Sequence, residues 1–263
     1  IKLVYYVILL YFFQPTTPNI MNISSGATTQ VTSSATASTN AVKPAISNVN
    51  KQHQSQPQQQ QQQLAQSQFV KFQELTEQAR YYFIVQTGDD ATQNLQTAAE
   101  HAVEAFAIYG GMSPSFLQIP PPYLSKEQHD EIRSSSYELL ILLAEREEAI
   151  AIDLGVSAQT DAARQSLQWI SLAENLGLKS LALLRYKARY QGSSGDEDQR
   201  DLTLLAAENF EPKTPLDFYL LAEEYRRENN FQNALSHYRK ALQLDPNNFW
   251  SLYQMGLCHM LDG

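Results

Sequence analysis

Residues 215–246 read PLDFYLLAEEYRRENNFQNALSHYRKALQLDP, and this stretch decides the fold. Its first half repeats apolar side chains at i, i+3, i+4 and i+7, which is the spacing of one helical face. These side chains are Phe218, Leu221, Ala222 and Tyr225. After a turn at Asn229-Asn230, a second helical face carries Ala234, Tyr238 and Ala241. The stretch therefore predicts a helical hairpin, with Ala222 and Ala234 where the two helices approach most closely.

This order of residues resembles the tetratricopeptide repeat (TPR), a helix-turn-helix unit of about 34 residues. Eight side chains match the signature positions of the family, with Ala222 in place of the more usual glycine and Phe218 in place of tryptophan: Phe218, Leu221, Ala222, Tyr225, Ala234, Tyr238, Ala241 and Pro246. One period later the next first helix has Leu252, Met255 and Gly256, and this second repeat is cut at Gly263. A single hairpin cannot bury its apolar face alone, so we expect the natural protein to continue beyond Gly263.

Upstream of this repeat the helical spacing continues while the TPR signature weakens. One period back, five residues still match: Leu184, Ala188, Leu204, Ala207 and Pro212. Helix starts are expected at Ser125, where Gln128 completes a capping box, and at Thr214-Pro215. We therefore predict an all-α fold of antiparallel hairpins stacked as a TPR-like solenoid. In it, 68–212 form degenerate repeats, and 213–263 form one full TPR plus the first helix of the next.

The N-terminal part has a different composition. Residues 1–13 are apolar except for Lys2, a run shorter than the roughly 20 residues that span a membrane. Three interpretations of 1–20 stay open: a truncated transmembrane helix, a leader or artefact before a start at Met21, and a cleaved signal peptide. Residues 21–67 are rich in Ser, Thr and Gln, which predicts a disordered linker. Its run Gln58–Gln63 can extend the helix expected from Leu64.

Charge and cysteine content exclude several classes of protein. Residues 1–63 carry three Lys and no Asp, Glu or Arg, so the other 200 residues hold 16 basic and 28 acidic side chains, a balance of −12. An acidic folded part argues against a nucleic-acid partner, because phosphate binding needs clustered Lys and Arg. A single cysteine, Cys258, excludes an internal disulfide and a cysteine-based zinc site.

A looser resemblance covers roughly 98–263. The order of five segments is similar to the TPR-bearing C-terminal region of bacterial serine/threonine kinases: 105–110, 137–144, 173–177, 217–222 and 244–250. The chain has no glycine-rich phosphate loop, His-Arg-Asp loop or Asp-Phe-Gly triplet. The resemblance implies a kinase tail or a standalone relative of one. We therefore predict a non-catalytic TPR scaffold for protein–protein interaction, and the alternative is a regulatory or sensor tail of a membrane-linked serine/threonine kinase whose catalytic domain is missing from this chain.

Catalytic and metal-binding candidates are weak. The densest carboxylate group reads as a solvated helix face balanced by Arg146 and Arg133: Glu145, Glu147, Glu148 and Asp153. His101 and Glu104 share one helical face but are too few for a metal site, so a partly buried histidine is favoured. Cys258 is expected to be a small core residue. We predict no enzyme activity and no cofactor.

We expect function to lie on the concave face formed by the first helices of the repeats. The candidate partner-binding residues are Leu216, Tyr219, Glu223, Arg226, Trp250, Tyr253 and Leu257. In TPR domains that clamp a C-terminal carboxylate this face has Lys and Asn, which Tyr219 and Glu223 replace, so an apolar extended or helical peptide of another protein is favoured. The alternative is that Trp250 packs under the next helix. The expected localisation is cytoplasmic, with a membrane anchor at or before residue 13 as an open option.

Overall fold

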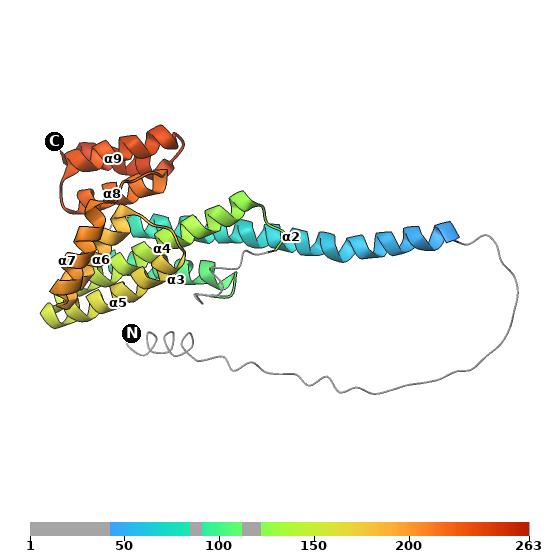
Figure 1. The fold of residues 1–263 in the computed structure, drawn as a ribbon, viewed down its shortest axis with the longest axis horizontal. Helices are drawn as coiled ribbons and strands as arrows, with labels where there is room; N and C mark the ends of the chain where they lie inside the picture. The colour runs from blue at the N-terminus through green and yellow to red at the C-terminus, as the bar shows by residue number, and fades with distance from the viewer. Residues whose placement is uncertain (1–42, 85–90, 112–121, 263) are drawn as a thin grey trace, which may run out of the picture. The chain divides into compact units, whose positions relative to one another are not determined.

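The computed structural model describes residues 43–84, 91–111 and 122–262, and for 43–56 and Asp153 it describes the backbone alone. All regular structure in these ranges is helical, without a strand, which confirms the all-α prediction. The elements, most of them labelled in Figure 1, are α2 (Lys43–Ile84), α3 (Ala91–Ala107), α4 (Lys126–Ala151), the 3₁₀-helix η2 (Ile152–Leu154), α5 (Val156–Asn175), α6 (Leu181–Ser194), α7 (Glu197–Glu208), α8 (Pro215–Arg227), α9 (Phe231–Leu244) and α10 (Phe249–Leu261).

Helix α2 starts earlier than the sequence suggests. The helix was expected from Leu64, with the run Gln58–Gln63 as a possible extension; it includes that run and its backbone begins at Lys43. Gln and Ala are good helix formers, and the run needs no apolar period to continue a helix that is fixed further along. Side chains 57–64 are exposed, and burial begins at Ala65. The predictions for 1–20 and for 21–42 lie outside the described residues.

The chain divides into two compact units, 1–65 and 66–263, and the hydrophobic core described below belongs to the second. Within the second unit, consecutive helices pack as pairs: α4 with α5, α6 with α7, and α8 with α9. Helix α10 packs on α9, and α5 packs on α6. Aromatic contacts from Phe72 to Tyr109 and from Tyr82 to His101 show that α2 and the α3 region run antiparallel. Adjacent pairs therefore stack as in a helical repeat protein.

Local sequence signals place the helix ends. Ser125 and Gln128 form the expected capping box, in which each side chain bonds the other's backbone N–H at 3.3 and 2.9 Å. Thr214 and Asp217 form a second box, with Pro215 between them at the start of α8. These bonds satisfy backbone N–H groups that have no partner inside the helix. They set where α4 and α8 begin, and hence which side chains α8 presents to its neighbours.

The core of the α8–α9 hairpin follows the TPR spacing. Five of the eight signature side chains are buried: Leu221, Ala222, Ala234, Tyr238 and Ala241. Ala222 and Ala234 have no exposed surface, as expected for small residues at a helix crossing. Phe218 and Tyr225 are half-buried, and both stack against the ring of His237. Within the described residues, no helix is long and apolar enough to cross a membrane.

Candidate functional site

The predicted binding residues lie on α8 and α10, which are first helices of their repeats. Five of them are half-buried and so keep part of their surface: Leu216, Arg226, Trp250, Tyr253 and Leu257. The other two, Tyr219 and Glu223, are only 3% and 7% exposed. Neither of these two side chains offers surface to a partner in this structure, which corrects the expectation that both face an open groove.

Tyr219 is buried among other polar and aromatic groups. Its ring packs tilted against Tyr238, with centroids 6.2 Å apart. Burial raises the pKa of Tyr219 well above its usual value, and Glu223 and Glu138 act in the same direction. The spacing of one TPR could not show this, because Glu138 comes from α4 and Arg80, which also acts on Tyr219, comes from α2.

Glu223 joins three helices from the inside. Its carboxylate accepts hydrogen bonds from the Tyr238 hydroxyl of α9 and from Gln254 Nε2 of α10, the latter at 3.2 Å. It also pairs with Arg226 of its own helix at 2.9 Å. Since a buried carboxylate needs partners for its lone pairs, this set fixes α8 against α9 and α10. Glu223 therefore positions the half-exposed Arg226.

An ion pair joins α2 to α4 beside these residues. Arg80 Nη2 lies 2.7 Å from Glu138 Oε2 and 3.3 Å from Ser135 Oγ. The two charged side chains are 14% and 6% exposed. Burial raises the pKa of Glu138, and the attraction of Arg80 only partly offsets this. Helix α2 therefore covers part of the face that sequence reasoning left open to a partner.

Three aromatic side chains gather at the start of α10, and we call Phe249, Trp250 and Tyr253 the α10 aromatic cluster. The Phe249 and Tyr253 rings stack 6.2 Å apart, and Trp250 meets both edge-on at 5.0 and 6.1 Å. Trp250 Nε1 donates a hydrogen bond of 3.1 Å to Glu77 Oε2 of α2. Phe249 is 61% exposed and was missed, because the TPR signature gives its position no role. A search of the sequence for aromatic residues at positions i, i+1 and i+4 of a helix would have found it.

The acidic group on α4 is paired with arginines. Glu147 is buried and pairs with Arg146 at 3.0 Å, so the predicted solvated face is wrong here: α4 is covered by neighbouring helices. Glu148 pairs with Arg189 of α6 at 3.1 Å, and Glu145 pairs with Arg227 of α8. Arg133, expected to balance this group, pairs with Asp130 instead. These carboxylates therefore serve helix packing.

A related pair links α6 to α8. Arg185 Nε lies 3.4 Å from Glu224 Oε2, and Glu224 is only 3% exposed. Burial raises the pKa of Glu224 to about 7, more than the neighbouring arginines lower it. Glu224 therefore changes charge near neutral pH, unlike a carboxylate in water.

The remaining candidates are His101 and Cys258. His101 is half-buried and stacks on Tyr82 with centroids 5.8 Å apart, as the partly buried reading expected. Cys258 is fully buried, as expected for a small core residue. This burial raises the pKa of its thiol. Side chains of His, Cys, Asp and Glu in the described ranges form no group of three or more suited to a metal ion.

Comparison with known proteins bears on the same end of the chain. A TPR repeat model matches residues 222–263. The match covers residues 222–227 at the end of α8 and all of α9 and α10, so it includes the α10 aromatic cluster. Neither the curated proteins nor the solved structures give a match to the chain. The TPR similarity therefore rests on residues 222–263. The helices before this segment also pack as hairpins, but their sequence does not match the TPR model.

Proposed function

We propose that this chain is a non-catalytic scaffold that binds another protein through the exposed side of its first helices, with the α10 aromatic cluster as the main anchor. TPR and other helical repeats generally mediate contacts between proteins, which supports the general class. The exposure of Phe249 is the observation that carries the proposal. A large aromatic side chain held at the surface by two aromatic neighbours is the kind of residue that dominates binding energy at interfaces.

The chemistry around the cluster favours an apolar peptide segment of the partner. Leu257 lies one turn beyond Tyr253 on α10, and Leu216 and Arg226 are half-exposed on α8. Aromatic and aliphatic surface would hold apolar side chains, and Arg226 would meet a polar end of the segment. Glu77 orients the Trp250 ring, so α2 acts as a support for the cluster.

The kinase-tail hypothesis has no specific observation in its favour. The described residues and the family comparison concern the helical repeat, and neither bears on an upstream catalytic domain. It stays a prediction that reading the natural gene upstream of Ile1 would test.

The proposal is tested by photo-crosslinking at Tyr253. Replacing Tyr253 with a photo-reactive phenylalanine analogue in the full chain should give a discrete set of protein adducts in cells. The same replacement at Ser236, an exposed position of α9, is the matched control and should not give this set. An identical set of adducts at both positions would contradict a specific surface at α10.

Binding of the captured partner should then depend on Phe249 and Tyr253. The double variant Phe249→Ala, Tyr253→Ala removes two anchors and should weaken binding by about 2–4 kcal/mol. The control is Leu202→Ala with Leu205→Ala on α7, two apolar side chains that are 60% and 59% exposed. Equal losses in the two double variants would show nonspecific hydrophobic adhesion and overturn the proposal.

A further inference from the structure

Helix α2 is held against α4 and α10 by polar side chains. Three of them are spaced like the heptad positions of a coiled coil and bond three side chains of α4 in the same order along the chain: Gln66 to Gln128, Gln73 to Glu131 and Arg80 to Glu138. The two helices therefore run parallel. On the same side of α2, Glu77 accepts the hydrogen bond from Trp250 of α10.

The aromatic side of α2 meets a different neighbour. The Phe72 ring lies 5.6 Å from that of Tyr109, and Tyr82 stacks on His101 of α3 at 5.8 Å. At about 100° per residue, Phe72 and Tyr82 lie roughly 100° and 180° around the helix from Gln73. The backbone of α2 also stays further from its neighbours than the backbones of the paired helices do. The polar side of α2 can therefore leave α4 while the aromatic side keeps its contacts to the α3 region.

Buried polar groups around this contact remain without partners. Four side-chain atoms of α2, α4 and α10 are buried and make no hydrogen bond within the described residues: Thr76 Oγ1, Ser136 Oγ, Ser251 Oγ and Gln254 Oε1. Ser136 follows Ser135, which bonds Arg80, and Ser251 follows Trp250. Since buried polar groups are normally bonded, this face has capacity for a helix that offers more polar partners than α2 does.

We propose that α2 is a built-in competitor for a helix-binding site on the concave face, and that an amphipathic helix of a partner protein takes its place there. The partner helix carries an arginine for Glu138 and amides one and two heptads before it, as α2 does, with further polar side chains for Ser136 and Ser251. Because α2 is tethered, its effective concentration is about millimolar, which sets the threshold for the partner. The site shares with the α10 aromatic cluster only the bond from Trp250 to Glu77, so either proposal can fail alone.

The test uses the full chain and two fluorescent synthetic helices with the sequence 64–84. Both are stapled between positions 70 and 74, which are exposed in α2. The first probe has the natural sequence, and the second carries Arg80→Glu. In the original chain α2 blocks the site, so both probes should bind weakly in fluorescence anisotropy. In the chain variant Arg80→Glu, Glu138 repels the chain's own helix, and the natural probe should bind at least about tenfold more tightly than to the original chain.

A charge exchange separates displacement from unfolding. The chain variant Arg80→Glu, Glu138→Arg restores the ion pair with reversed polarity, so its own helix should return and its affinity for the natural probe should fall again. Glu138→Arg alone should prefer the second probe. Undiminished affinity in the double variant would overturn the proposal. So would an Arg80→Glu chain that keeps its helicity in circular dichroism and gains no affinity.

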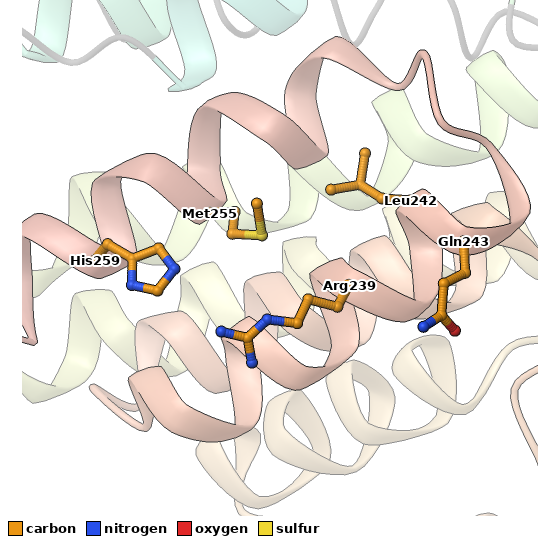
Figure 2. Close-up of a pocket in the computed structure, with 5 residues that line it drawn as sticks. All are labelled: Arg239, Leu242, Gln243, Met255 and His259. Carbon is orange, nitrogen blue, oxygen red and sulfur yellow. The ribbon is translucent and has the colours of Figure 1, made fainter.

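The control lies at a hollow of about 330 Å3 between α9 and α10, which is an alternative place for a helix (Figure 2). Five side chains line it: Arg239, Leu242, Gln243, Met255 and His259. Arg239 is exposed, and Arg239→Glu makes the same change of charge as Arg80→Glu away from α2. It should leave both affinities as they are in the original chain. Equal effects of the two variants would assign the probe to the hollow and overturn the proposal.

A distance measurement tests displacement without changing Arg80 or Glu138. Spin labels at Lys71 of α2 and Ser236 of α9, both exposed, are introduced in a Cys258→Ala background and followed by pulsed electron resonance. Excess natural probe should change the distribution of distances between the labels. A bound probe with an unchanged distribution would contradict displacement of α2, because the probe would then bind elsewhere.

Discussion

Breaking the buried pair of Arg80 and Glu138 tests how α2 is attached to α4. The variant Arg80→Met keeps most of the apolar stem but leaves the Glu138 carboxylate, 6% exposed, without its cation. Removing one partner of a buried ion pair costs about 3–5 kcal/mol, and the partial exposure of Arg80, at 14%, argues for the lower end. We therefore expect a loss of about 3 kcal/mol in the free energy of unfolding, measured by urea denaturation followed by circular dichroism.

The double variant Arg80→Met, Glu138→Leu separates charge from packing. Because both charges are gone, its stability should lie within about 1 kcal/mol of the original chain. The loss in Arg80→Met should also grow from pH 5 to pH 8. Arg80 lowers the pKa of Glu138 against the effect of burial, so removing Arg80 raises this pKa further, and the variant loses more stability than the original chain as pH rises.

The control for this cycle is an exposed ion pair on α5. Arg164 and Asp161 are 61% and 72% exposed, so Arg164→Met should change stability by no more than about 0.5 kcal/mol. Equal losses in Arg80→Met and in the double variant would refute the reasoning, because the cost would then come from packing alone. A loss as small as that of Arg164→Met would also refute it.

Three further predictions follow from other residues. Ala234→Leu should overpack the α8–α9 crossing and cost about 1–3 kcal/mol in calorimetry, whereas Ser236→Ala should stay within about 0.5 kcal/mol; equal effects would mean a wrong helical register. Burial raises the pKa of Glu224 from 4.5 to about 7, so the folded state loses stability as pH rises between these values. The stability of Glu224→Gln relative to the original chain should therefore be higher at pH 8 than at pH 5. Parallel curves of unfolding free energy against pH for the two chains would contradict this. Burial and the nearby Lys240 lower the pKa of His237 to about 4, so NMR titration should find a midpoint far below 6.5, rising in Lys240→Ala; an ordinary midpoint would contradict the stacked position.

Most helix positions could be predicted because their signals are local. Ser125 and Thr214 are caps that the structure uses as expected, and the apolar face with Ala222 and Ala234 is buried as the spacing requires. The start of α2 at Lys43 was not predicted, because the residues before Leu64 have no apolar period that would reveal a helix.

The candidate site was harder to predict, since it depends on contacts between distant segments. Tyr219 and Glu223 stand off the TPR signature, which suggested exposure, but Arg80 and Glu138 close over this region from α2 and α4. The spacing of residues within one repeat cannot predict that a helix distant in the sequence packs against it. Phe249 was missed because the TPR signature gives its position no role; it lies in the first turn of α10 and is 61% exposed.

Hydrogen exchange across α10 tests the proposed scaffold function most directly. The measurement compares the full chain alone with the chain bound to the partner captured at Tyr253. We expect slower amide exchange in residues 249–257 on binding and no change in α7, whose exposed leucines serve as the internal reference. Unchanged exchange in 249–257, with slower exchange elsewhere in the chain, would contradict binding through the α10 aromatic cluster.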